Sequence, residues 1–349
     1  MTLPLRPASF EDYVGQSETK ERLKVLAFGL RAKVAAAFSP QDKAKIQSRH
    51  LLIEGPPGYG KTILAGIYAG LLSSFAKADN WPVYDAKGFP PPVEEWEGPG
   101  QPKTLYRYAA LEGRDLISPD FLDDYLLYLQ PQGVIFIDEI QAAPKRTLLG
   151  DSPLLTVLET GMWHSSRRQM MLHRDGFTMI AATTDPGKIP APLRERFELI
   201  RLRDYSPEEL GELASRLAAR MGIFLSSGAV GVLVDRSRGC PRDVVQAVQW
   251  IDLSLAAEGK SGEVSPSFAE KAMEMRGIGR LGLTDDDISV LRALSGGPMG
   301  VGGLIAMTQY GSKENFATVE DFLLRKGFIG RSSRGRVITE EGKRVLVGL

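Results

Sequence analysis

The sequence contains one cysteine, Cys240, and only three histidines among its 349 residues. A single cysteine excludes an internal disulfide, and three scattered histidines disfavour a zinc site. No apolar run reaches the ~18 residues that a membrane-spanning helix needs. The first residues, MTLPLRPASFEDY, lack the charged head and apolar centre of a secretory signal. We therefore expect a cytoplasmic protein that makes no use of a membrane.

An excess of charge of one sign is also missing, because Lys and Arg total 43 and Asp and Glu total 43. A balanced chain has no global field that attracts nucleic acid, so any such surface has to be local. Hydrophobic residues make up 43% and charged residues 25% of the chain. These proportions are typical of a globular protein of this length with two or three domains.

Residues 53–66, IEGPPGYGKTILAG, contain the spacing G-x-x-x-x-G-K-T that is typical of a phosphate-binding loop. In such a loop, backbone N–H groups at a helix N-terminus surround the phosphates of a nucleotide. A buried strand at 50–54 and a helix from residue 61 provide the expected context, which disfavours a chance glycine turn. We expect Lys61 to reach the β- and γ-phosphates and Thr62 to bind Mg²⁺. The residues predicted to bind ATP here are Gly55, Pro56, Pro57, Gly58, Tyr59, Gly60, Lys61, Thr62 and Ile63.

An acidic pair follows a second buried strand in the segment VIFIDEI. Asp138 at the strand end is suited to hold Mg²⁺ together with Thr62. Glu139 is suited to orient and deprotonate the attacking water as a general base. The alternative, an acidic pair that only caps the next helix, is disfavoured by the phosphate-binding loop upstream.

A third strand at 177–184 ends in Thr183 and Thr184 and is followed by Arg194 and Arg196. An arginine beyond a strand end can reach a nucleotide held by a neighbouring subunit and stabilise the transition state. Spacing alone favours the alternative, in which either arginine forms a surface ion pair. Arg242, at the start of a later helix, could contact the γ-phosphate, although its local sequence alone favours a solvated arginine at a helix start.

The alternation of strand-like runs and helical stretches over the first two hundred residues predicts an α/β fold, with a parallel sheet covered by helices on both faces. Residues 80–103 are rich in proline and glycine and are too long for an ordinary connection. They form either a surface excursion with a functional use or a tolerated insertion.

The character of the chain changes near residue 204. A Ser-x-x-Glu capping box at Ser206 opens an amphipathic helix, and helices at 226–236 and 241–258 follow. A second capping box runs from Thr284 to Asp287. The expected elements beyond it are helices at 285–294, 300–308 and 315–326 and closing strands at 328–331 and 336–340. Three helices followed by a two-stranded ribbon indicate a winged helix.

The order of these motifs resembles that of the AAA+ ATPases, and within them the RuvB family of Holliday-junction branch-migration motors. The segment LRPASFEDYVGQSETKERL resembles the N-terminal adenine-binding segment of that family. The motifs GPPGYGKT, VIFIDEI, AATT, PLRERF and RSRGCPRDV follow in the family order, and GFIGRSSRGRVIT resembles its winged helix. The resemblance implies an AAA+ nucleotide-binding domain at 1–203, a helical lid at 204–277 and a winged-helix DNA-binding domain at 278–349.

The same resemblance assigns roles to residues at matching positions. It places Arg6, Tyr13 and Val14 in adenine binding. It makes Thr183 the first sensor, Arg196 the arginine finger and Arg242 the second sensor. It also implies a hexameric ring with nucleotide between subunits.

In the winged helix the resemblance implies that Arg331, Arg334 and Arg336 contact DNA. Residues 321–349 contain seven Lys or Arg and three Asp or Glu, which fits a local basic surface. Nothing in the wing resembles a cluster of base-reading Asn or Gln, so we expect binding to be indifferent to DNA sequence.

Three features depart from the family pattern. The insertion at 80–103 lengthens the stretch between the phosphate-binding loop and the acidic pair, and Asp185 replaces a basic residue. The segment 159–177 is shorter than the hairpin that docks the partner protein RuvA. We expect Trp163, Met170, Met171 and Leu172 to offer a different apolar surface, and Trp81 and Trp96 a second one. The predicted partner is therefore a DNA-processing protein other than an ordinary RuvA.

These observations favour an ATP-driven DNA translocase that acts as a ring on duplex or four-way junction DNA. A DNA-binding ATP switch that loads or recruits another protein is the alternative, and a protein remodeller that uses the winged helix as an adaptor is a third. DNA-stimulated ATP turnover with strand movement distinguishes the first from the other two.

Overall fold

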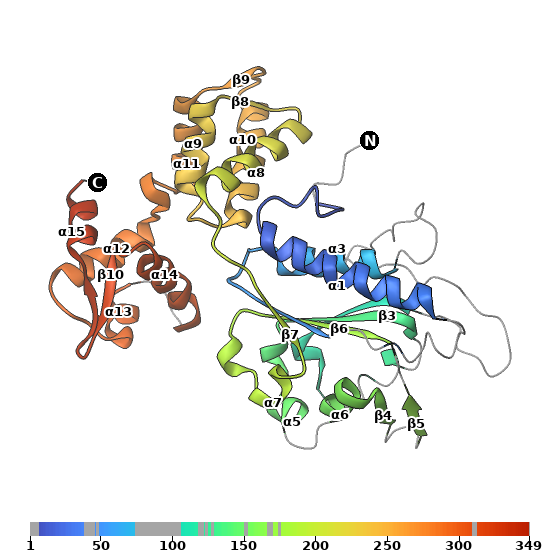
Figure 1. The fold of residues 1–349 in the computed structure, drawn as a ribbon. Coiled ribbons are helices and arrows are strands. Elements are labelled where there is room, and N and C mark those ends of the chain that lie inside the picture. The colour runs from blue at the N-terminus through green and yellow to red at the C-terminus, as the bar shows by residue number, and fades with distance from the viewer. Residues whose placement is uncertain are drawn as a thin grey trace. The chain divides into compact units, whose positions relative to one another are not determined.

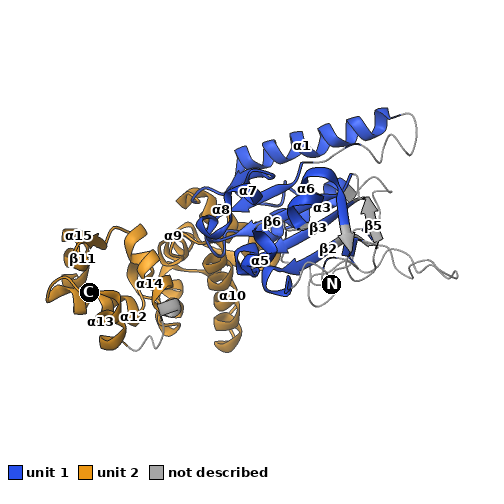
Figure 2. Ribbon diagram, turned by 90° about the horizontal axis from the view of Figure 1, so that it is seen from below, with its two compact units in different colours: residues 1–204 blue, residues 205–349 orange. Residues whose placement is uncertain are grey.

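The computed structural model describes residues 7–37, 46, 49–73, 106–117, 122, 125–126, 129–149, 153–165, 170–173, 176–308 and 313–348. Arg6 and the insertion at 80–103, with Trp81 and Trp96, lie outside these residues. The chain forms two compact units, 1–204 and 205–349 (Figure 2). No helix among the described residues is both long and apolar enough to cross a membrane.

Unit 1 contains a five-stranded sheet in which every neighbouring pair of strands is parallel. In spatial order its strands are β2 (Tyr106–Glu112), β3 (Leu129–Asp138), β6 (Thr178–Thr183), β1 (Leu51–Glu54) and β7 (Glu198–Arg201). Because all strands run the same way, their carboxyl ends meet along one edge of the sheet. The predicted α/β class is therefore confirmed.

Helices cover both faces of this sheet (Figure 1). On one face lie α1 (Ser17–Ala36) and α3 (Lys61–Ser73), and on the other lie α5 (Lys145–Leu148), α6 (Pro153–Thr160) and α7 (Ala191–Arg194). Every residue of β1 and β6 is buried. This burial explains why these strands read as continuous apolar runs rather than as alternating ones.

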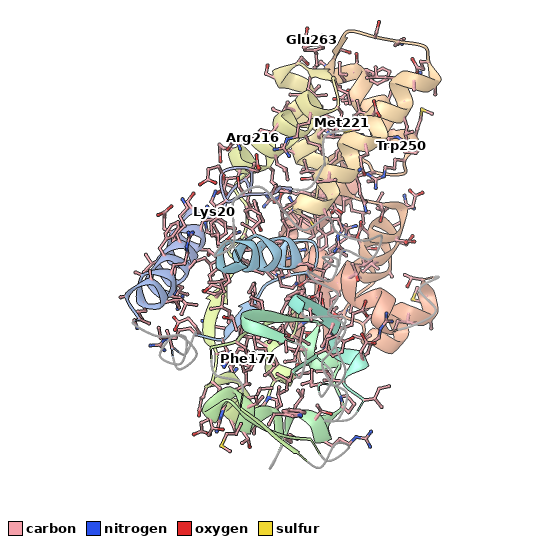
Figure 3. The ribbon with its side chains drawn as sticks, turned by 90° about the vertical axis from the view of Figure 1, so that its right-hand side faces the viewer. Lys20, Phe177, Arg216, Met221, Trp250 and Glu263 are labelled. Atoms are coloured by element: carbon pink, nitrogen blue, oxygen red, sulfur yellow. The ribbon has the colours of Figure 1, made fainter. Side chains whose placement is uncertain are left out.

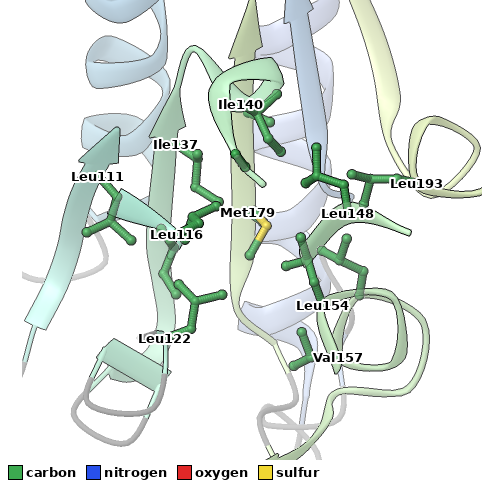
Figure 4. Packing of buried hydrophobic residues seen from close by; sticks show 14 of the residues in the cluster. Leu111, Leu116, Leu122, Ile137, Ile140, Leu148, Leu154, Val157, Met179 and Leu193 are labelled. Carbon is green, nitrogen blue, oxygen red and sulfur yellow. The ribbon is translucent and has the colours of Figure 1, made fainter. Parts of the chain in front are cut away.

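One part of the described core lies between the sheet and α5–α7 (Figure 4). Ile137 and Met179 project from the sheet toward Leu148, Leu154 and other aliphatic side chains. Burial of such side chains contributes about 1.5–3 kcal/mol each.

Trp163 belongs to this core and is 1% exposed, so the expectation that it offers a docking surface was wrong. It lies on β4 (Met162–Ser165), which pairs antiparallel with β5 (Met170–His173). The large ring fills the core next to α6, where burial outweighs exposure for so much apolar area. The side chains of Met170, Met171 and Leu172 lie outside the described part of the chain.

Unit 2 begins with four helices. They are α8 (Pro207–Arg220), α9 (Ser227–Arg236), α10 (Pro241–Ala257) and α11 (Pro266–Met275). The predicted capping box is present, because Ser206 Oγ accepts from Glu209 N at 3.2 Å and Ser206 N donates to Glu209 Oε2 at 2.9 Å. Short strands β8 (Phe224–Leu225) and β9 (Glu263–Val264) pair in parallel beside the helices. Trp250 of α10, labelled in Figure 3, donates its indole N–H to the Ala272 carbonyl at 2.7 Å.

The rest of unit 2 has the order of a winged helix. Its elements are α12 (Asp285–Ser295), α13 (Val301–Met307), α14 (Lys313–Arg325), β10 (Ile329–Ser332), β11 (Gly335–Ile338) and α15 (Glu340–Val347). The second capping box is present too, since Thr284 N donates to Asp287 Oδ2 at 2.8 Å.

The helix α15 was not predicted, and the expected strand at 336–340 ends two residues earlier. Thr339 ends the strand because its hydroxyl accepts from Gly342 N at 3.0 Å and so caps α15. A Cβ at Gly342 would overlap the Phe328 carbonyl oxygen, so this close packing of α15 requires glycine.

Candidate active site

The predicted phosphate-binding loop connects β1 to α3, which is the strand–loop–helix context that the motif requires. Gly58 and Gly60 have φ values of 81° and 84°, in the left-handed region that favours glycine. A Cβ at Gly60 would lie 2.7 Å from the Tyr13 hydroxyl, and one at Gly55 would lie 3.0 Å from Leu202 Cβ. The glycines of the motif are thus required both by backbone conformation and by close packing.

Lys61 is 5% exposed and bends back over the loop. Its Nζ donates to the carbonyl oxygens of Gly55 at 2.8 Å and Pro56 at 3.1 Å. This places a positive charge within the loop, next to the N-terminus of α3, where the helix dipole also favours an anion. The arrangement fits a nucleotide phosphate.

Tyr13 and Val14, the expected adenine-binding residues, are both buried. The Tyr13 hydroxyl donates to the Tyr59 carbonyl at 2.9 Å, and the Tyr59 hydroxyl donates to Asp204 Oδ1 at 2.9 Å. Lys20 of α1, labelled in Figure 3, donates to the Tyr13 carbonyl at 2.7 Å. The N-terminal segment is therefore attached to the tip of the phosphate-binding loop.

Gln16 makes a second attachment that the sequence did not predict. Its Nε2 donates to the Arg203 carbonyl at 2.7 Å, and its Oε1 accepts from Arg203 N at 3.1 Å. The side-chain amide thus pairs with both the backbone N–H and the backbone C=O of one residue near the end of unit 1. Gln16 itself has a left-handed backbone with φ 52°, a conformation that its neighbour Gly15 also adopts.

The expected magnesium ligands meet at the carboxyl edge of the sheet. The Thr62 hydroxyl donates to Asp138 Oδ2 at 2.6 Å, and Asp138 Oδ1 accepts from Glu139 N at 3.0 Å. Within the described ranges, no group of three or more His, Cys, Asp or Glu could hold a metal alone. One hydroxyl and one carboxylate beside a phosphate site fit Mg²⁺, which is bound through few protein oxygens, phosphates and water.

Glu139 follows Asp138 in a left-handed conformation, with φ 48° and ψ 49°. Its Oε2 accepts from the Thr184 hydroxyl at 2.8 Å and from Gln141 Nε2. The Thr183 hydroxyl donates to Gln141 Oε1 at 2.7 Å. The structure thus joins the predicted base and the predicted sensor through Gln141, which sequence reasoning did not single out.

Arg196 lies just beyond α7, and its guanidinium is bound within its own chain. It donates to Glu159 Oε2 at 2.7 Å and to the Pro192 carbonyl at 2.6 Å. Arg194 is exposed on the same short helix. Arg242 belongs to unit 2, where it is exposed in the first turn of α10.

The wing brings two of its three predicted arginines together. Arg331 on β10 and Arg336 on β11 are directly opposite in register, and both donate to Glu320 Oε1, at 3.1 and 2.8 Å. Glu320 is 7% exposed and comes from α14, so its carboxylate lies behind the pair. Arg334 lies exposed between the two strands. Glu320 carried no sequence signal, because its role depends on the packing of α14 against the wing.

Comparison with known families agrees with this architecture. The model of the Holliday junction DNA helicase RuvB P-loop domain matches residues 5–88, and that of the ATPase family associated with various cellular activities matches 51–205. The model of the RuvB C-terminal winged helix domain matches residues 280–347. The matched segments include the phosphate-binding loop, the acidic pair Asp138–Glu139 and both strands of the wing.

Whole-chain relatives give the same result. The Holliday junction branch migration complex subunit RuvB of Desulfosudis oleivorans is 32% identical over 98% of this chain and 89% of the relative, and that of Rhodopirellula baltica is 30% identical over 96% and 82%. The solved structure described as the Thermotoga maritima RuvB Holliday junction branch migration motor superimposes with a TM-score of 0.72 at 26% identity, covering 98% of each chain. By its motifs, fold and full-length similarity, this chain belongs to the RuvB family of AAA+ ATPases.

Proposed function

We propose that this protein is an ATP-driven motor that moves duplex DNA at a four-way junction, as a branch-migration helicase of the cytoplasm. One observation carries the proposal: a phosphate-binding loop, a Thr62–Asp138 pair and Glu139 share one edge of a sheet, in a chain that ends in a winged helix. A hydrolytic site and a DNA-binding module in one polypeptide are what such a motor requires.

In the proposed reaction, Lys61 and the backbone N–H groups of residues 58–62 hold the phosphates of ATP. Thr62 and Asp138 would hold Mg²⁺, which neutralises charge on the phosphate oxygens when it is bound. The Glu139 carboxylate orients a water and accepts its proton as the water attacks the γ-phosphorus, while the bond from the γ-phosphorus to the β–γ bridging oxygen breaks and ADP leaves. Tyr13 and Val14, with Arg6, are proposed to bind the adenine.

Arg196 is proposed to act on the nucleotide of a neighbouring subunit in a hexameric ring, with Thr183 and Arg242 as sensors. An arginine finger contributes on the order of 10³-fold or more to turnover. Mixing Arg196→Ala and Lys61→Ala subunits should restore part of the activity, because some interfaces then combine an intact loop with an intact finger. Absence of rescue after verified subunit exchange would argue against a finger in trans.

The wing is proposed to contact the phosphate backbone through Arg331, Arg334 and Arg336. Phosphate contacts supply affinity without reading sequence, which suits a protein that moves along DNA. Removing one arginine–phosphate interaction lowers the slope of log affinity against log salt by about one. A triple Arg→Ala variant with an unchanged slope would remove the wing from the interface.

The partner protein is proposed to dock on the β4–β5 hairpin and to differ from an ordinary RuvA. The short segment 159–177 supports this, and Met162 is an exposed apolar residue at the base of the hairpin. Deleting the hairpin would also remove the buried Trp163, so Met162→Ser is the cleaner probe. Nanomolar binding of a RuvA-type domain that Met162→Ser weakens would contradict the proposal.

The deciding experiment compares the wild type with Glu139→Gln, which keeps the shape of the side chain and removes the base. We expect wild-type hydrolysis to be stimulated by four-way DNA and to be accompanied by branch migration. Glu139→Gln should bind ATP and lose both activities by about 10²-fold or more. Glu212→Gln on the exposed face of α8 is a matched control. Stimulation of hydrolysis by DNA without strand movement would instead indicate a loader.

A further inference from the structure

The backbone of Glu139 is held in an uncommon conformation. A left-handed residue other than glycine costs about 1–2 kcal/mol and persists only where its surroundings fix it. Gly113 packs against this backbone so closely that a Cβ at Gly113 would overlap the Glu139 carbonyl oxygen. The turn after β3 is therefore tightly packed, and the side chain leaves it in a defined direction.

The carboxylate at the end of this side chain is held by an amide. Gln141 Nε2 donates to Glu139 Oε2 and also to Thr184 Oγ1 at 2.9 Å. Thr184 Oγ1 in turn donates to Glu139 Oε2 at 2.8 Å. Glu139, Gln141 and Thr184 thus form a closed triangle of hydrogen bonds, in which one oxygen of the carboxylate accepts two of them.

The other end of the amide reaches the neighbouring strand. Gln141 Oε1 accepts the Thr183 hydroxyl proton at 2.7 Å, while Thr183 Oγ1 accepts from Asp185 N at 3.0 Å. Thr183 is fully buried at the end of β6, which lies beside β3 in the sheet. Since this hydroxyl donates its one proton to Gln141, the side chain of Thr183 is connected to the base through the amide.

We propose that Gln141 is a positioning residue for ATP hydrolysis, which fixes the Glu139 carboxylate and couples it to Thr183. The inference rests on the proposed function, because it takes Glu139 as the base. Only a side chain with a donor and an acceptor at the same end can make both contacts, and an amide has this property. Asparagine would be one methylene too short to keep them.

The magnitude follows from geometry. Displacement of a catalytic group by about 1 Å costs up to roughly 10²-fold in rate, while substrate contacts made elsewhere are unaffected. Loss of Gln141 should therefore lower kcat and leave nucleotide affinity unchanged. A residue that merely stabilised the fold would alter binding and melting temperature together.

The test uses Gln141→Met in the full chain, a substitution that keeps length and removes the amide. We expect kcat to fall by about 10- to 100-fold, with KM and the affinity for a fluorescent ATP analogue within about twofold of wild type. The melting temperature of the nucleotide-free protein should fall by only a few degrees, as for the loss of one hydrogen bond. Gln246→Met, which removes a surface contact with Arg276, is the matched control and should keep wild-type turnover.

A double-mutant cycle with Thr183→Val tests the coupling. If Thr183 acts through Gln141, the double variant loses no more than the stronger single variant, because both changes break the same connection. Wild-type kcat in Gln141→Met, or effects of the two changes that multiply, would overturn the inference. Glu139→Gln is assayed in parallel: wild-type hydrolysis in that variant would refute the proposed base, whereas absence of branch migration with a normal Gln141 effect would refute only the motor.

Discussion

Gly113 is a residue without a side chain that packs against the backbone of the proposed base, Glu139. It opens a short 3-10 helix after β2, and the Glu139 backbone fills the space where a Cβ would be. Its own backbone is not in the left-handed region, so the need for glycine here comes from packing alone. The turn that follows β2 therefore restricts where the backbone of the proposed base, Glu139, can lie.

Gly113→Ala should lower ATP turnover by at least about tenfold, because the added methyl displaces the Glu139 carbonyl and moves its carboxylate. ATP binding should change little, since Lys61 and the phosphate-binding loop are untouched. Steady-state hydrolysis and analogue binding check this. Gly231→Ala on α9 is the control, as a Cβ there meets nothing within 4 Å and replaces glycine inside a helix. Normal turnover in Gly113→Ala would show that the turn tolerates displacement.

Sequence predicts some of these residues and misses others for a physical reason. Lys61, Thr62 and Asp138 are readable because their chemistry depends on fixed spacing within one loop or at one strand end. Gln141 and Glu320 are not, since each acquires its role from side chains that folding brings close. The contacts of Gln141 with Thr183 and of Glu320 with Arg336 join residues far apart in the chain.

Elements follow the same division. The capping boxes at Ser206 and Thr284 predict the starts of α8 and α12, because the partners of a cap lie three residues apart. The strand predicted through residue 340 failed, since β-branched residues favour extension until Thr339 turns its hydroxyl toward the next helix. Local signals therefore predicted the starts of α8 and α12, whereas the local cap at Thr339, which ends the strand and starts α15, was missed.

The ribbon of β10 and β11 with α14 behind it gives a prediction for DNA binding. Glu320→Gln should tighten binding to duplex DNA and raise the salt slope by about one, because the carboxylate that offsets Arg331 and Arg336 is removed. Glutamine keeps an acceptor for both guanidinium groups, so the strands should keep their register. A salt series of affinities measures the effect.

Asp321→Asn removes the same charge one residue away, where Asp321 pairs with Arg325 on the exposed side of α14. Its effect should be smaller than that of Glu320→Gln. Equal effects would mean that only net charge matters, and weaker binding in Glu320→Gln would mean that the carboxylate is needed to hold the arginines.

For the whole molecule, one buried histidine gives stability a dependence on pH. His50 Nδ1 accepts from Met179 N at 2.9 Å, and its Nε2 lies 3.2 Å from the Leu158 carbonyl. Burial lowers the pKa of His50 from 6.5 to about 4, against the raising effect of the bond to Leu158. The neutral ring, from the residue just before β1, therefore contacts both β6 and α6.

Because the folded-state pKa is the lower one, the unfolded chain takes up the proton first as pH falls. The contribution of His50 to the free energy of unfolding is therefore complete above pH 6.5. It is lost progressively as the pH falls to 4, by at most roughly 3 kcal/mol. Urea unfolding at pH 7.5 and pH 5 should show this loss in the wild type. In His50→Gln the free energies of unfolding at pH 7.5 and pH 5 should differ by less than in the wild type. The same difference in the variant and the wild type would assign the pH dependence to other groups.

The whole chain divides into compact units between residues 204 and 205, and the separation of unit 2 into a lid and a winged helix remains a prediction. The sequence indicates the boundary between the two units by the Ser206 cap, because this cap starts α8 shortly after β7, the last strand of the sheet, has ended. It could not indicate which contacts secure the end of unit 1, because these come from Gln16 and Tyr59, far away in the chain.

Those contacts connect the end of unit 1 to the phosphate-binding loop and to the N-terminal segment. The chain leaves unit 1 at Asp204, whose carboxylate is bound to the hydroxyl of Tyr59 at the tip of the phosphate-binding loop, while Arg203 is clasped by Gln16. A pull on residue 205 therefore bears first on two side-chain attachments rather than on β7 alone. If the proposed motor loads the chain at residue 205, we expect the load to reach Tyr59 in the phosphate-binding loop through Asp204.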